Sequence, residues 1–151
     1  MEEFIMTQES FDRLWARVQG APPPQTKPSG EAQLLRFLEE TGETQLQERR
    51  LAAVFPAMLP LCRETKSRCV RLETQYYLRT GRRAVLPASC CLRQSPLPLL
   101  RALCLAARAR AAAYAAASAD APDLAALYRD LAGEEQLHAD ALERLIARLL
   151  C

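Results

Sequence analysis

The sequence predicts an all-α protein, and three observations support that prediction. Alanine is abundant while aromatic residues make up only 6% of the 151 residues, which favours close-packed helices over strands. Apolar residues recur at spacings of three and four along long segments, the period of a helix buried on one face. Proline lies between these segments or in their opening turns, where it separates helices without breaking them.

Four long helices are predicted between residue 31 and residue 151. Each boundary has a signal: proline stops a helix, serine followed by proline starts one, and glycine accepts the left-handed conformation after a last turn. These signals come from Pro56, Gly81, Ser95 with Pro96, and Pro122. The predicted helices cover residues 31–54, 57–79, 95–118 and 122–151.

The N-terminal part of the chain is predicted to be separate from these helices. A weak helical pattern of apolar residues precedes Gly20, and the next ten residues include four prolines, a density that favours an extended linker. The predicted organisation has three parts: a short N-terminal helix in residues 1–19, a Pro-rich linker in residues 20–30, and a four-helix bundle in residues 31–151.

The lengths of the connections predict two helix hairpins. The first two long helices, and the last two, are joined by short connections, which makes each pair antiparallel. Residues 82–94 form a longer connection. Thirteen extended residues reach about 45 Å, enough to cross a helix about 35 Å long. The connection could therefore cross the whole bundle or stay as a loop at one end.

Composition and charge argue against two classes of partner. The net charge is +2, and the arginines alternate with acidic and apolar residues, so we expect no nucleic-acid partner. Arg, Pro or Asp interrupts the longest apolar stretches and the first residues are acidic, so neither a membrane span nor a signal peptide is predicted. We expect a cytoplasmic protein.

The six cysteines follow neither a zinc nor a disulfide pattern, because the sequence contains no Cys-x-x-Cys and one histidine. Cys62 and Cys69 lie on one predicted helix about 10 Å apart along its axis, too far for a disulfide. We expect them to be small buried residues. The adjacent Cys90 and Cys91 fall in a predicted loop, where an incidental and a functional role both stay open.

The last helix places two polar residues in the centre of an apolar stripe. Glu135 and His138 lie one turn apart on the face that points to the core. An unpaired buried carboxylate is costly, so these side chains need partners, and a carboxylate and an imidazole on one face suit a metal ion. The stripe comprises Leu124, Tyr128, Leu131, Glu135, His138, Leu142, Leu145 and Leu149.

The same phasing predicts a shared polar layer near the middle of the other helices. On the first helix the stripe comprises Leu34, Leu38, Thr41, Gln45, Glu48, Ala52 and Phe55. On the second it comprises Met58, Leu61, Thr65, Arg68 and Leu72. On the third it comprises Leu97, Leu100, Cys104, Ala107, Ala111 and Tyr114, apolar except for the tyrosine. The predicted layer contains Thr41, Glu48, Thr65, Arg68, Tyr114, Glu135 and His138.

These features resemble the rubrerythrin branch of the ferritin-like superfamily over about residues 31–150. The resemblance is carried by the Ala-rich third helix with its tyrosine, by Glu-x-x-His within residues 127–139, and by residues 71–81, which resemble the second helix of small bacterial members. It implies a ferritin-like antiparallel four-helix bundle. Such proteins hold two irons with a Glu from the first and third helices and a Glu-x-x-His from the second and fourth. They reduce peroxide or oxidise iron.

The resemblance carries over to only part of this ligand set. On the second helix the Glu-x-x-His positions fall on Thr65 and Arg68, and on the third the carboxylate position falls on Ala107 or Arg108. On the first helix the nearest match is Thr41, with Glu40, Glu43 and Glu48 close by. Iron, if bound, is therefore predicted to be held by Glu135, His138 and Glu48. Arg68 is predicted to fill part of the metal cavity and to pair with Glu135 or Glu48.

Three functions follow from these residues. The first is a non-catalytic ferritin-like scaffold or interaction module with a degenerate di-iron site and no catalytic residue. The second is an iron-binding oxidoreductase that handles peroxide or iron through a reduced site. The third is an unrelated four-helix bundle in which the buried Glu and His are structural. In each case we expect self-association, as a homodimer, through faces of the bundle.

Overall fold

The structure, a computed structural model, describes residues 30–86 and 95–151. In these residues the chain forms four long helices, one short 3-10 turn and no strand, which confirms the predicted all-α class. The predicted N-terminal helix, almost all of the Pro-rich linker and the Cys90–Cys91 pair lie outside the described residues. The elements are α2 (Gly30–Val54), η1 (Pro56–Met58), α3 (Leu59–Thr80), α4 (Pro96–Asp120) and α5 (Ala125–Leu150).

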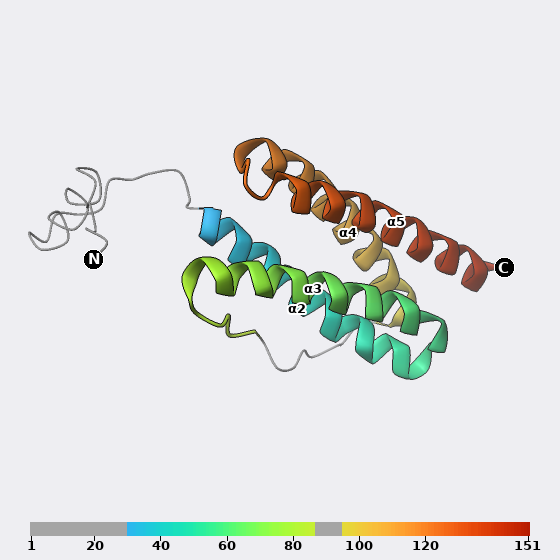
Figure 1. The fold of residues 1–151 in the computed structure, drawn as a ribbon. Helices are drawn as coiled ribbons and strands as arrows, with labels where there is room; N and C mark the ends of the chain where they lie inside the picture. Colours follow the sequence, from blue (N-terminus) through green and yellow to red (C-terminus); the bar gives the residue numbers. More distant parts are fainter. Residues whose placement is uncertain (1–29, 87–94) are drawn as a thin grey trace, which may run out of the picture.

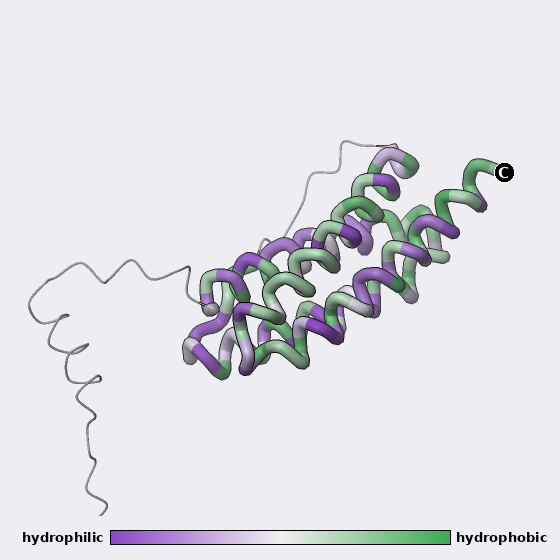
Figure 2. Tube along the Cα trace, turned by 90° about the horizontal axis from the view of Figure 1, so that it is seen from above, coloured by the Kyte–Doolittle hydropathy of each residue, from purple (hydrophilic) through white to green (hydrophobic). Residues whose placement is uncertain are grey.

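The four helices pack as two antiparallel hairpins, α2 with α3 and α4 with α5 (Figure 1). The 3-10 turn η1 reverses the chain in the first hairpin, where the Phe55 N–H donates to the Leu51 carbonyl at 2.7 Å. Purple and green stretches alternate along each helix in Figure 2, as expected for helices that bury one face.

The helix ends follow the predicted signals with one shift. Gly81 has a left-handed φ of 68° after the last turn of α3, and its N–H donates to the Tyr77 carbonyl at 2.8 Å. Glycine adopts this conformation without a steric penalty. By contrast, α5 begins at Ala125 and not at Pro122, because residues 121–124 form a turn in which the Leu124 N–H donates to Ala121.

The two hairpins are arranged so that α3 and α4 run in the same direction. Met58 of η1 and Leu61, near the start of α3, share one apolar cluster with Leu99 and Leu103, near the start of α4. The ends of both helices share a second cluster at the other end of the bundle. Thr80 and Pro96 therefore lie at opposite ends of the bundle (Figure 1). The segment that joins them, residues 82–94, was predicted either to cross the bundle or to stay as a loop at one end, and its residues 87–94 lie outside the described part of the chain.

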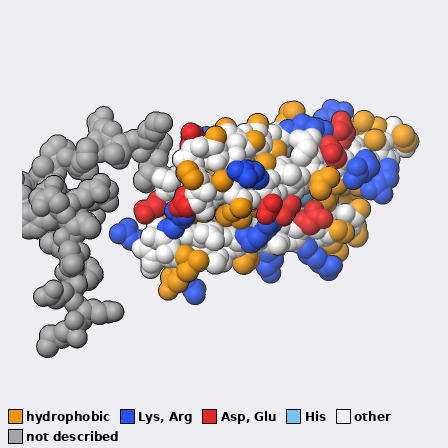
Figure 3. Space-filling view, turned by 45° about the horizontal axis from the view of Figure 1, so that its top comes forward, with side chains coloured by type: hydrophobic (Ala, Val, Ile, Leu, Met, Phe, Trp, Pro, Cys, Tyr) orange, Lys and Arg blue, Asp and Glu red, His pale blue; other side chains and the backbone are white. Residues whose placement is uncertain are grey.

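The surface carries charges of both signs. On the face drawn in Figure 3, acidic and basic side chains lie next to one another over several helices, between scattered hydrophobic side chains. No helix in the described part of the chain is long and apolar enough to cross a membrane.

Three aromatic rings form the centre of the second apolar cluster. The ring centroids of Phe37 and Tyr114 are 4.3 Å apart, and those of Tyr114 and Tyr128 are 5.9 Å apart. Both tyrosines are fully buried. Burial raises the pKa of Tyr114 far above its ordinary value and raises the pKa of Tyr128 as well, because the phenolate would lose its hydration.

The buried tyrosines should make stability fall at alkaline pH. Above about pH 10 tyrosine loses its proton in the unfolded chain, while the native state keeps it, so the native state binds more protons. The free energy of unfolding then decreases as pH rises, by at most about 1.4 kcal/mol per pH unit for each tyrosine. Urea unfolding between about pH 9 and about pH 11 measures this slope. Tyr114→Phe should reduce it, and an unchanged slope would contradict the assignment.

Core packing should depend strongly on one face of α5. Leu142 is completely buried, whereas Leu137 on the same helix is 69% exposed. Leu142→Ala should lower the free energy of unfolding by about 2–5 kcal/mol, because it removes buried methyl groups and leaves a cavity. Leu137→Ala is the matched control and should change stability by less than about 0.5 kcal/mol. Urea denaturation of both variants checks this, and equal losses would mean that the helix is rotated.

Candidate functional site

A layer of buried polar side chains lies between the two apolar clusters, at mid-length of all four helices. Each member is at most 5% exposed, and four of the eight are completely buried. Such groups are tolerated in a core only when hydrogen bonds or ion pairs replace water. The layer, together with Tyr114 at its edge, comprises Thr41, Thr44, Glu48, Thr65, Arg68, Arg110, Glu135 and His138.

One half of the layer is centred on Glu48 of α2. Its Oε1 lies 2.7 Å from His138 Nε2 of α5, and its Oε2 accepts a hydrogen bond from the Thr65 hydroxyl of α3 at 2.8 Å. In the tautomer that donates from Nε2, His138 satisfies an ionised Glu48 carboxylate, which only accepts hydrogen bonds. Glu48 therefore joins three helices through two short contacts.

The other half is centred on Glu135 of α5. Arg110 of α4 binds this carboxylate with two nitrogens, Nε to Oε1 at 2.9 Å and NH2 to Oε2 at 3.3 Å. Its third nitrogen donates to the Thr44 hydroxyl of α2 at 2.9 Å. Planar guanidinium and carboxylate groups fit each other in this two-point arrangement. Arg110 thus satisfies Glu135 and ties α4 to α2.

Arg68 of α3 connects the two halves. Its NH2 donates to the Thr65 hydroxyl at 3.1 Å, and its Nε lies 3.5 Å from Glu135 Oε1. Its NH1 lies 4.0 Å from Glu134, which also forms an ion pair with Arg71 near the surface. The buried carboxylates, both guanidiniums and the histidine therefore form one continuous network.

The network balances its own charge. It contains two buried carboxylates, Glu48 and Glu135, and two buried guanidiniums, those of Arg68 and Arg110, both of which contact Glu135. A buried pair is stable when its members satisfy each other, and loss of one member leaves an uncompensated charge. No external cation is needed to neutralise the layer when His138 is neutral.

His138 has a second ring nitrogen that points elsewhere. Its Nδ1 is buried and has no hydrogen-bond partner among the described residues. The nearest charged group is the carboxylate of Glu64, 3.7 Å away, on a side chain that is 58% exposed. This contact lies on the α3 side of the histidine, away from Glu48.

The structure brings together every site residue named from the sequence. Glu48, Glu135 and His138 are buried in the layer with Thr65 and Arg68. Arg68 approaches Glu135, one of its two expected partners. Thr41 and Tyr114 are also buried, with their hydroxyls 3.4 Å apart at the edge of the layer.

Two members of the layer were missed. Thr44 is buried where Gln45 was expected, and Gln45 is only half-buried. Arg110 is buried although the third helix was expected to contribute only a tyrosine. A stripe through Leu103, Ala107, Arg110 and Tyr114 has the same helical spacing as the chosen one. Charge balance offered another signal, because two carboxylates and one arginine leave one negative charge unpaired.

The residues present do not fit a pair of iron ions. All four oxygens of Glu48 and Glu135 are already in contact with protein nitrogens or hydroxyls. Two arginines supply the positive charge that metal ions would otherwise bring. Within residues 30–86 and 95–151, no group of three or more His, Cys, Asp or Glu side chains is arranged to hold a metal ion. The ligand role of Glu48, Glu135 and His138 stays a prediction, and these contacts weigh against it.

The third-helix positions expected from the resemblance have other roles. Ala107 is buried in the first apolar cluster. Arg108 is on the surface, where it forms ion pairs with Glu143 and Asp140 of α5. Neither position supplies a carboxylate.

Comparisons with known proteins give no match to this chain: no family model, no curated protein and no solved structure is similar to it. Functional inference therefore rests on the contacts of the layer and on the surface around it.

The network predicts a large difference between two arginines of α4. Arg110→Ala should lower the free energy of unfolding by about 3–5 kcal/mol, because it leaves Glu135 buried with a single, longer ion pair. Arg108→Ala removes an exposed ion pair and should cost less than about 1 kcal/mol. Urea unfolding of the two variants measures the difference. Similar losses would show that Arg110 is not part of a buried network.

Proposed function

We propose that this chain is a non-catalytic member of the ferritin-like superfamily, a bundle that acts as a scaffold or interaction module. An ion-pair network takes the place of the two irons. The observation that carries the proposal is that protein nitrogens and hydroxyls occupy every oxygen of Glu48 and Glu135. A redox or hydrolytic metal site needs carboxylates that are free to bind metal and an open coordination position.

The order and direction of the helices support the ferritin-like part of this proposal. Ferritin-like bundles consist of two hairpins joined by one long crossover. Here α3 and α4 run in the same direction, so the end of α3 and the start of α4 lie at opposite ends of the bundle (Figure 1). A Glu-x-x-His pair on the last helix, here Glu135 and His138, is also expected of such a bundle.

The environment of the layer argues against chemistry without a metal. General acid–base catalysis requires a titratable group within hydrogen-bond reach of a substrate. Glu48, Glu135 and His138 are at most 1% exposed, and each of them contacts another side chain of the protein. Their contacts connect the four helices to one another, which is a structural role.

One observation favours a second candidate, a metal-binding protein with a single ion. In the neutral tautomer that donates from Nε2 to Glu48, His138 carries a lone pair on Nδ1, which lies 3.7 Å from the Glu64 carboxylate and has no hydrogen-bond partner among the described residues. Histidines that bind a metal through one ring nitrogen commonly donate a hydrogen bond from the other ring nitrogen to a carboxylate. Two protein ligands are fewer than the three or four of a zinc site, so this candidate ranks second.

Metal analysis separates the two candidates. Protein expressed with added iron, and protein titrated anaerobically with Fe²⁺ or with Zn²⁺, should contain metal well below one ion per chain by mass spectrometry. The network needs no cation, so His138→Ala should give the same low content. Two irons per chain would contradict the scaffold proposal.

The same experiment can support the second candidate. One ion per chain that is lost in both His138→Ala and Glu64→Ala would establish a single-metal site. Glu143→Ala, which changes an exposed carboxylate on α5, is the matched control and should leave the metal content unchanged.

A further inference from the structure

The outer face of α4 is unusually apolar for an exposed surface. Ala102, Ala109 and Ala113 are exposed there, and Ala106 is half-buried. Leu105 is 70% exposed on the same helix. A contiguous apolar strip on a helix normally packs against another element. The described residues cover only the inner face of α4. We therefore expect another segment or molecule to pack against its outer face.

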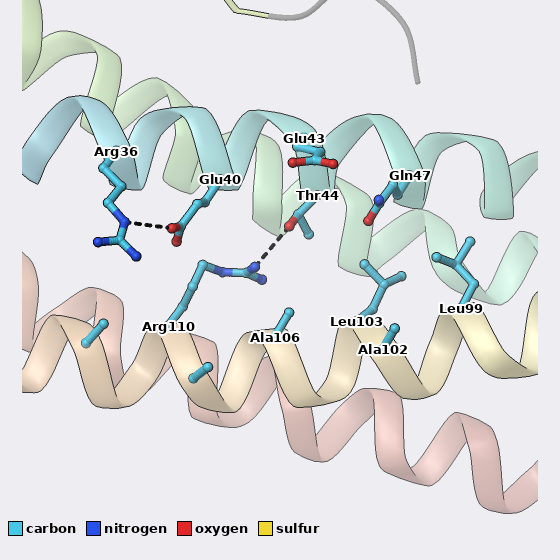
Figure 4. A pocket seen from close by; sticks show the side chains of 12 residues that line it. Arg36, Glu40, Glu43, Thr44, Gln47, Leu99, Ala102, Leu103, Ala106 and Arg110 are labelled. Carbon is cyan, nitrogen blue, oxygen red and sulfur yellow. Dashed lines mark hydrogen bonds and ion pairs between the residues drawn. The ribbon is translucent and has the colours of Figure 1, made fainter. Parts of the chain in front are cut away.

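A groove runs along this face between α2 and α4. It has a volume of about 520 Å³. Figure 4 shows the alanines of α4 on one side and the polar side chains of α2, from Arg36 to Gln47, on the other. The four groove alanines are spaced by three or four residues, so they form one continuous strip. Because alanine is small, another helix can approach this strip closely.

We propose that residues 4–19 of this chain occupy the groove as a helix. The sequence pattern would place their apolar residues on one face of a helix. A helix of sixteen residues is about 24 Å long, and the stretch of α4 that lines the groove is about 21 Å long. The apolar face comprises Phe4, Phe11, Leu14, Trp15 and Val18.

The position where the described chain begins favours this segment over any other occupant. Gly30 starts α2, two turns before Arg36 at one end of the groove. The ten residues from 20 to 29 can extend to about 33 Å, enough to place Gln19 beside Arg36. The segment would then run parallel to α4, with its N-terminal end toward Leu99.

The tether also gives this segment an advantage over a second copy. A short linker holds it near the groove at an effective concentration in the millimolar range. Aromatic side chains bury about 150–250 Å² each, and the segment offers three of them to a strip of small side chains. Large residues against small ones allow close packing.

Trp15 provides a direct test because it is the only tryptophan. In the full chain, its fluorescence should be shifted to shorter wavelength relative to urea-unfolded protein, and acrylamide should quench it several-fold less efficiently. Both properties should be independent of protein concentration. Ala109→Glu places a charge in the groove and should shift the emission back toward that of exposed tryptophan.

The control is Ala115→Glu, the same substitution at an exposed position of α4 outside the groove. It should leave the emission of Trp15 unchanged, and circular dichroism should show that both variants keep their helices. Solvent-like emission in the unmodified chain would overturn the proposal, as would protected emission that survives Ala109→Glu. Protection that disappears on dilution would also overturn it and assign the groove to a second copy.

Discussion

The burial of two carboxylates in the middle of a four-helix bundle is the constraint on which the rest of this structure depends. Glu48 and Glu135 are completely buried, and leaving one of them without a partner would cost about 3–5 kcal/mol, a large fraction of a domain's net stability of about 5–15 kcal/mol. Arg110 of α4 and Arg68 of α3 pair with Glu135, and His138 of α5 contacts Glu48. Because these contacts are directional, they fix how far each helix slides along its neighbours, which apolar packing alone does not.

The same contacts determine what the interior can do. The carboxylates of Glu48 and Glu135 already contact Thr65, His138 and Arg110, so neither has a free oxygen to offer a metal ion. We therefore expect the interior to stabilise the fold, and we expect interactions with other molecules to involve the surface. The apolar outer face of α4 and its groove are the surface features that most require an explanation, and a segment of the chain itself is our proposed occupant.

The sequence predicted those parts of the fold and site that have an unambiguous helical phase. On α5, leucines on one face and charges on the other left a single phase, which placed Glu135 and His138 in the core. On α4, alanine occurs on every face, so the phase was ambiguous and Arg110 was missed. Contacts between side chains of different helices were even harder to predict. Whether Glu48 meets His138 depends on the register of α2 against α5, which no local pattern encodes.

A double-mutant cycle between Arg110 and Glu135 tests the central claim most directly. Four proteins are compared by urea unfolding: the unmodified chain, Arg110→Met, Glu135→Leu and the double variant. Arg110→Met leaves Glu135 with only its longer contact to Arg68, and Glu135→Leu leaves Arg110 without its ion pair. The double change removes one buried charge of each sign. We predict that each single variant loses about 3–5 kcal/mol and that the double variant recovers most of that loss. Additive losses would contradict the account, because they would mean that the two side chains do not depend on each other.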